Sequence, residues 1–158
     1  MPPSTYSIDE AQELTRQAAK AISDTQPEVW GMPEWNICHH LANELAKKFE
    51  GFNLDVELRK QDGRRPDIVV HQRGHNENNL IVFQVKIKPS TASIQEDLDK
   101  IRNTFFQEPY SYKYGIFLSV GKLPDPLPEL DKSRIRIVEV YGWARMTNEE
   151  FEERKRQR

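Results

Sequence analysis

A central apolar stretch, Leu80-Ile-Val-Phe-Gln-Val-Lys-Ile87, contains two polar residues that core strands rarely tolerate unless they are paired or functional. Side chains alternate along a strand, so Gln84 and Lys86 should point to one face. A second polar residue, Asp67, opens the short apolar run Ile68-Val-Val70. If the two stretches pair as a hairpin, a carboxylate, an amide oxygen and an ammonium meet at one end of a sheet.

These three groups together suit the hydrolysis of a phosphodiester. That reaction needs a hard cation to neutralise developing charge and to activate water. Magnesium takes oxygen ligands, keeps several waters and needs only one or two protein carboxylates. A neighbouring lysine can orient the attacking water and stabilise the charged transition state. The residues therefore predict a site for Mg²⁺ or Mn²⁺.

Apolar spacing and turn signals predict the element order α-α-β-β-β-α-β-β-α around this site. Three capping-box patterns support helix starts: Ser7 with Glu10, Ser93 with Glu96, and Thr147 with Glu150. The helices are expected at about 8–26, 33–49, 94–106 and from 147 onward. Gly51 stands where a left-handed C-terminal cap is expected for the second helix.

Five strands are predicted, at about 52–59, 67–71, 80–87, 112–120 and 135–141. The first three are joined by short turns and should form an antiparallel meander. The wholly apolar Ile116-Phe-Leu118 predicts that the fourth strand is buried on both faces. The proline-containing segment 121–133 should be an irregular loop. A meander followed by a helix and another strand predicts an α/β fold with a mixed central sheet flanked by helices.

Composition narrows the class of protein. The 158 residues, 37% hydrophobic and 30% charged, fit one globular domain over 1–158, with its core at about 33–120 and loose ends at 1–6 and 154–158. The net charge of −2 shows no global excess of basic residues, although local patches matter more for nucleic-acid binding. Cys38 is the single cysteine, which excludes an intramolecular disulfide. With no signal-like N-terminus and no apolar run of about 18 residues, we expect a cytoplasmic protein.

Pro66-Asp67, followed seventeen positions later by Gln84-Val85-Lys86, resembles the motif of the PD-(D/E)xK nuclease superfamily, which has the restriction-endonuclease-like fold. The element order is also similar: a leading helix, the hairpin with the motif, a helix and a buried strand. The stretches 65–74 and 79–86 are similar to a group of uncharacterised bacterial members. The resemblance covers roughly residues 33–120.

The resemblance implies a Mg²⁺- or Mn²⁺-dependent deoxyribonuclease. Asp67 would be the principal metal ligand, the Gln84 side chain and the Val85 carbonyl would complete the set, and Lys86 would be the catalytic lysine. The superfamily often adds an acid from the leading helix, and Glu34 is the first choice because Glu34-x4-His39 looks like that group's helix. Glu44 is the alternative. DNA is the implied partner, and a homodimer or a partner subunit is compatible with so small a domain.

Gln84 departs from the family pattern, which usually has Glu or Asp there. The loss of one negative charge should weaken metal binding, although Mrr-like restriction endonucleases also carry Gln at this position. Two alternatives follow. The chain could be an inactive nuclease-fold module that binds protein or nucleic acid. Alternatively, Lys86 could be a structural residue at the sheet end that reaches water, with Gln84 as a hydrogen-bonded polar neighbour.

The remaining polar residues give weaker signals. Four basic residues just before Asp67 could hold phosphates or simply form a solvated turn: Arg59, Lys60, Arg64 and Arg65. The four histidines and Cys38 show no zinc-binding spacing. Cys38 lies in the middle of a predicted helix and is expected to be a buried structural residue.

Overall fold

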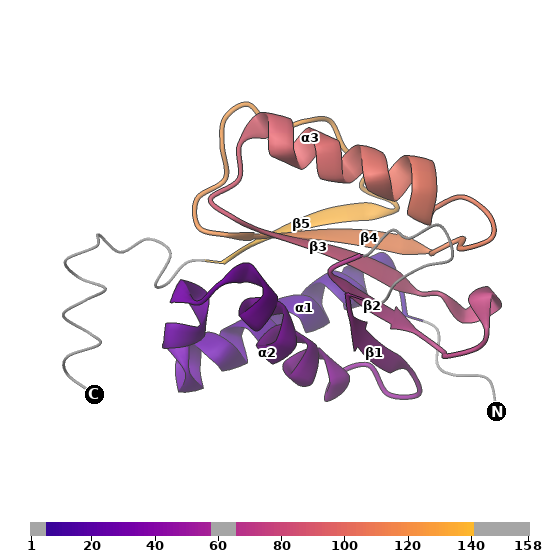
Figure 1. Ribbon diagram of the computed structural model, residues 1–158, viewed down its shortest axis with the longest axis horizontal. Helices are drawn as coiled ribbons and strands as arrows, with labels where there is room; N and C mark the ends of the chain where they lie inside the picture. The colour runs from indigo at the N-terminus through magenta and orange to yellow at the C-terminus, as the bar shows by residue number, and fades with distance from the viewer. Residues whose placement is uncertain (1–5, 58–65, 141–158) are drawn as a thin grey trace.

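The computed structural model describes residues 6–57 and 66–140 (Figure 1). The helices are α1 (Ile8–Thr25), α2 (Glu34–Ala46) and α3 (Thr91–Lys100), with 3₁₀ turns at Pro27–Gly31 and Asn76–Asn78 and a π-helical turn at Ile101–Phe105. The strands are β1 (Asn53–Val56), β2 (Ile68–His71), β3 (Ile81–Ile87), β4 (Tyr114–Val120) and β5 (Ile135–Val140). The predicted final helix and the turn before Asp67 lie outside the described residues.

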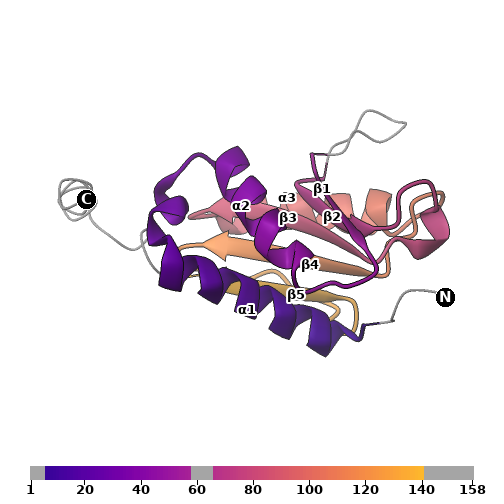
Figure 2. The ribbon, with the colours of Figure 1, turned by 90° about the horizontal axis from the view of Figure 1, so that it is seen from below.

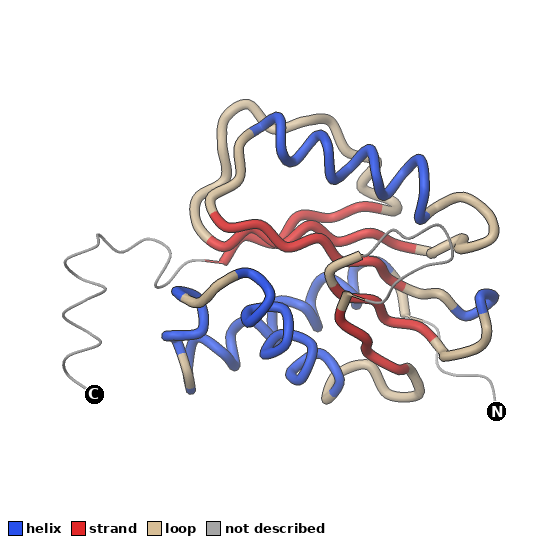
Figure 3. Tube along the Cα trace, viewed as in Figure 1, coloured by secondary structure: helices blue, strands red, loops and turns tan. Residues whose placement is uncertain are grey.

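The five strands form one mixed sheet in the order β1-β2-β3-β4-β5. β1, β2 and β3 pair antiparallel, whereas β4 runs parallel to both β3 and β5. The predicted meander and the predicted mixed α/β sheet are therefore confirmed. α3 makes the crossover from β3 to β4, and the irregular loop that leads to β5 runs back along α3 (Figure 3). Thr91 donates to the Pro126 carbonyl and Arg102 to the Glu129 carbonyl in that loop, each at 2.8 Å.

Helices cover both faces of the sheet, α1 and α2 on one face and α3 on the other (Figures 1 and 2). The core beneath α1 and α2 includes Ile81, Phe83 and Val85 of β3. The core beneath α3 includes Val82 of the same strand, because alternate side chains enter opposite layers. All seven residues of β4 are buried, as its apolar sequence predicts.

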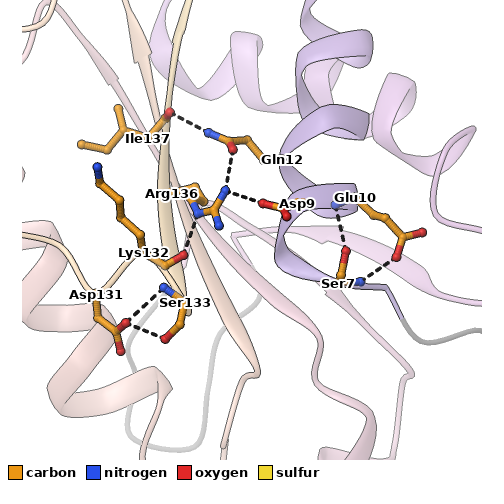
Figure 4. Close-up of polar contacts among 9 residues, drawn as sticks. All are labelled: Ser7, Asp9, Glu10, Gln12, Asp131, Lys132, Ser133, Arg136 and Ile137. Atoms are coloured by element: carbon orange, nitrogen blue, oxygen red, sulfur yellow. Dashed lines mark hydrogen bonds and ion pairs between the residues drawn. The ribbon is translucent and has the colours of Figure 1, made fainter.

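Polar contacts fix α1 to the edge strand β5 (Figure 4). The Arg136 guanidinium donates to Asp9 at 2.8 Å and to the Gln12 side-chain oxygen at 2.9 Å. The Gln12 amide in turn donates to the Ile137 carbonyl at 3.3 Å. The capping box of Ser7 and Glu10 starts this helix as predicted, so α1 has a defined beginning and a defined partner.

The predicted start of α3 is wrong. Ser90, not Ser93, is the N-cap, and Ser93 occupies the third helical position expected for Glu96. The Ser93 hydroxyl accepts the Ser90 N–H at 3.0 Å, so serine here does what glutamate does in a standard capping box. α2 also ends at Ala46, three residues before the predicted Phe49, although Gly51 beyond it has the expected positive φ of 84°. Among the described residues, no helix is long and apolar enough to cross a membrane.

Candidate active site

Asp67 lies at the point where β2 stops pairing with β3. The last backbone pair of this ladder joins Ile68 to Phe83. One residue further, the Asp67 carboxylate accepts the Val85 N–H at 2.7 Å, so a side chain replaces a backbone partner. The N–H and C=O of one strand residue point to the same side, which directs the Val85 carbonyl past the end of β2 as well. The paired strands thus bring Asp67 beside the Gln84-Val85-Lys86 segment, as the sequence predicts.

Gln84 and Lys86 lie on the face of β3 that α3 covers, because they alternate in register with Val82. The Gln84 side chain is buried. The Lys86 side chain is 35% exposed. The site therefore has one accessible ammonium and one buried amide on the same face of β3.

Glu34 is the first residue of α2 and approaches the same group of charges. Burial raises the pKa of its carboxyl; the Lys86 ammonium opposes that rise, whereas Asp97 and Glu57 add to it. The alternative acid, Glu44, lies ten residues further along, about 15 Å at the usual helical rise. It pairs with Lys47 at 3.0 Å. The structure therefore brings Glu34, and not Glu44, to the candidate site.

The Asp67 carboxyl has a strongly perturbed proton affinity. Burial raises its pKa from 3.8 to about 6, against the lowering effect of the Val85 hydrogen bond. The nearby Glu34 and Asp97 raise the pKa further, and Lys86 lowers it. Cys38, one turn after Glu34, is buried, and its pKa is raised first by that burial and then by Asp67 and Glu34. It is a protonated structural thiol, as expected.

Asp97 is a member of this group that sequence reasoning missed. It lies on α3 with its side chain only 2% exposed, and its two oxygens face Lys86 at 3.9 Å and Lys100 at 3.8 Å. Its Oδ2 has no hydrogen-bond partner among the described residues. A signal was present in the sequence, because Asp97 falls inside the apolar helical stripe of Ile94, Leu98 and Ile101, where a charged residue is out of place.

The ionisable side chains at this end of the sheet are mostly acidic. Glu34 and Asp67, together with the groups that act on them, Asp97, Glu57 and Lys86, carry four negative charges against one positive charge. In the part of the chain that the structure describes, no three His, Cys, Asp or Glu side chains are grouped to hold a metal ion by themselves. A cation here would therefore need the Gln84 amide and Val85 carbonyl oxygens, and Mg²⁺ accepts such a set because it keeps several waters.

The remaining predicted residues fall elsewhere. The four basic residues at positions 59, 60, 64 and 65 lie outside the described residues. His71 contacts the Asp55 carboxylate at 2.7 Å, and Arg73 donates two hydrogen bonds to the same carboxylate at 2.9 and 2.7 Å. The Arg73 hydrogen bond, with a smaller contribution from His71, lowers the pKa of Asp55 to about 2. This second polar cluster joins β1 to the end of β2.

Comparison of the chain with family models, with curated protein sequences and with solved structures finds no match. The functional evidence is therefore confined to the residues of this chain and to their geometry. Its main elements are a perturbed carboxyl immediately before β2, an ammonium on β3 and acids from two helices on opposite faces of the sheet.

Proposed function

We propose that this chain is a Mg²⁺- or Mn²⁺-dependent nuclease that hydrolyses DNA phosphodiester bonds at a PD-(D/E)xK-type site on a restriction-endonuclease-like core. The observation that carries the proposal is the Asp67 carboxylate, which accepts the Val85 N–H at 2.7 Å and interacts electrostatically with Glu34 and Lys86. A partly buried carboxylate with an excess of negative charge around it favours binding of a divalent cation.

Each residue has a distinct role in this proposal. Asp67 and Glu34 supply carboxylate oxygens, and Gln84 and Val85 supply neutral oxygens. A bound Mg²⁺ or Mn²⁺ would neutralise charge on the phosphate and lower the pKa of water. The Lys86 ammonium donates hydrogen bonds that orient the attacking water and stabilise the negative charge that develops on the phosphate oxygens.

A second candidate function is favoured by Gln84. An amide in place of the usual acid removes one negative charge, which lowers the affinity for a cation without disturbing the fold. The chain would then be a module that keeps the nuclease architecture and binds protein or nucleic acid without cutting it. The two functions differ in whether cleavage depends on Asp67 and Lys86.

Cleavage of supercoiled plasmid and single-stranded DNA with Mg²⁺ or Mn²⁺, and with EDTA as the metal-free control, tests the proposal. Losing one charge-stabilising group should lower the rate by ~10² or more in Asp67→Ala and in Lys86→Ala. The matched controls are Glu13→Ala on exposed α1 surface and Lys132→Ala, which precedes β5 and so lies at the opposite end of the parallel strands. Both controls should cut like the wild type.

Two results would contradict the nuclease assignment. Cleavage that survives in Asp67→Ala and Lys86→Ala would show that another group, or a contaminant, is responsible. If neither the wild type nor Gln84→Glu cleaves any substrate, the result would favour the binding module. Cutting by Gln84→Glu alone would show a complete site attenuated by the amide.

A further inference from the structure

The helix that covers the candidate site carries a carboxylate on its buried face. Asp97 lies between Ile94 and Leu98, which pack into the core beneath α3. Burying a charge is costly unless hydrogen bonds and ion pairs compensate it. Here the Oδ2 atom has no hydrogen-bond partner among the described residues, and the two lysines stand at 3.8 and 3.9 Å. Packing alone therefore does not explain why a carboxylate stands at position 97.

Stability does not explain Asp97. The two lysine contacts are longer than a hydrogen bond, and burial raises the pKa of this carboxyl against the opposing effect of the two lysines, so keeping it ionised lowers the stability of the fold. Buried ion pairs can often be replaced by apolar residues without loss of stability. α3 is already anchored by Ile94 and Leu98, and the π-helical turn after it by Ile101, all fully buried. Asp97 is therefore better explained by its effect on a neighbour.

That neighbour is Lys86. The Lys86 ammonium acts on three carboxylates at once, Glu34, Asp67 and Asp97. Its four-carbon side chain is flexible and can reach more than one of them. If it paired with Asp67 and Glu34, it would occupy the oxygens that the proposed site offers to a cation. Asp97, on the opposite side, attracts the same ammonium toward α3.

We propose that Asp97 is a positioning residue, whose buried carboxylate holds the Lys86 ammonium on the α3 side, directed at the substrate phosphate and away from the metal ligands Asp67 and Glu34. The inference rests on the proposed nuclease function and adds a residue to it. It also accounts for the long distance of 3.9 Å between Lys86 Nζ and Asp97 Oδ2. At this distance Asp97 attracts the ammonium without taking a hydrogen bond from it, so its three hydrogens can be donated to water and phosphate.

A double-mutant cycle tests this arrangement. Asp97→Asn keeps the shape of the side chain and removes its charge, and Lys86→Met keeps the length of the lysine and removes its ammonium. The matched control is Asp99→Asn on the same helix, whose side chain is 52% exposed and pairs with Arg102. Mn²⁺ affinity is measured by calorimetry, and kcat and KM for DNA cleavage are measured at saturating Mn²⁺.

With Lys86 present, Asp97→Asn should weaken Mn²⁺ binding about tenfold, because the released ammonium pairs with the metal ligands. It should lower kcat roughly 10- to 100-fold with little change in KM, the scale expected for a misplaced catalytic group. In the Lys86→Met background the same substitution should change either quantity less than threefold. A through-space charge effect alone would instead be the same in both backgrounds, since independent effects add.

The melting temperature separates positioning from a structural role. Asp97→Asn should melt at or above the wild-type temperature, because it removes a buried charge. A variant that does not fold would be replaced in the same cycle by Asp97→Ser, with the same expected coupling.

The possible failures are distinguishable. Additive effects of the two substitutions, or wild-type kcat in Asp97→Asn, would overturn the positioning role while leaving the nuclease intact. Coupled Mn²⁺ affinities without DNA cleavage by any variant would refute the nuclease and support the placement of Lys86 by Asp97.

Discussion

Replacing Asp67 with asparagine should stabilise the metal-free protein. The folded state raises the pKa of this carboxyl from 3.8 to about 6, so folding disfavours its ionised form. At about 1.4 kcal/mol for each tenfold change in proton affinity, this corresponds to about 3 kcal/mol of lost stability. Asparagine removes the charge and keeps an oxygen that can accept the Val85 N–H. The free energy of unfolding should therefore rise by up to about 3 kcal/mol at pH 7.5.

The stability advantage of Asp67→Asn over the wild type should grow as the pH rises. Because the pKa is raised on folding, the cost of the wild-type carboxylate is fully present above pH 6 and disappears below pH 3.8. The difference between Asp67→Asn and the wild type should shrink across that window and vanish near pH 3.5. Urea unfolding in EDTA, followed by tryptophan fluorescence at pH 7.5, 5 and 3.5, measures it. Glu13→Gln on the exposed surface of α1 is the control for loss of a carboxylate outside the site.

Added Mn²⁺ should reduce the difference in stability between Asp67→Asn and the wild type. A ligand present at 100 times its dissociation constant stabilises the folded state by about 2.7 kcal/mol. The wild type should gain that amount and Asp67→Asn much less, so the two stabilities converge. An Asp67→Asn protein that is less stable than the wild type at pH 7.5 in EDTA would refute the reasoning, since the carboxylate would then be fully compensated in the folded state.

Three further changes have expected outcomes. Gln84→Glu should bind Mn²⁺ more tightly than the wild type in calorimetry, because it restores a negative charge; unchanged affinity would mean that this side chain is not a ligand. Asp55→Asn should lower the free energy of unfolding by about 1 kcal/mol at pH 7, because Arg73, its main partner, is 63% exposed and water screens their attraction. That difference should disappear as the pH falls from 3.8 toward 2, because Arg73 holds the pKa of Asp55 at about 2. Gly115→Ala should cost roughly 1–3 kcal/mol in urea unfolding, because its Cβ would lie 2.8 Å from Ile101 Cγ2; wild-type stability would show that Ile101 moves freely.

Local periodicity was enough to predict much of the architecture. Alternation along residues 80–87 indicates which side chains share a face, and the apolar 116–118 segment indicates a central strand; both features depend only on neighbours in the sequence. The approach of Asp67 to Lys86 follows from the same alternation once the strands pair as a hairpin. Glu34 and Glu44 could not be separated this way, because the choice depends on which end of α2 meets the sheet.

The place of Asp97 in the candidate site could not be predicted from local sequence patterns. Its position in an apolar stripe is visible in the sequence, but its partner lies on another element. Only the packing of α3 over β3 brings it to Lys86. The start of α3 was missed because Ser90 and Ser93 are both acceptable caps, and the choice between them is made by the first helical hydrogen bond, which joins the Ile94 N–H to the Ser90 carbonyl. Long-range packing therefore decided the role of Asp97, whereas the local pattern of helical hydrogen bonds decided the start of α3.

The contact of α1 with β5 has a consequence for how the protein is made. Asp9 and Arg136 are 127 positions apart, so α1 cannot reach β5 until nearly the whole described chain has been translated. The last candidate site residue, Asp97, emerges well before Ile135 begins that strand. During this interval the apolar residues Ala18 and Ile22 of α1 lack part of their final packing partner. The nascent chain therefore holds all the candidate site residues while the edge of β4 that pairs with β5 is still open, and such an unpaired edge promotes chaperone binding or aggregation.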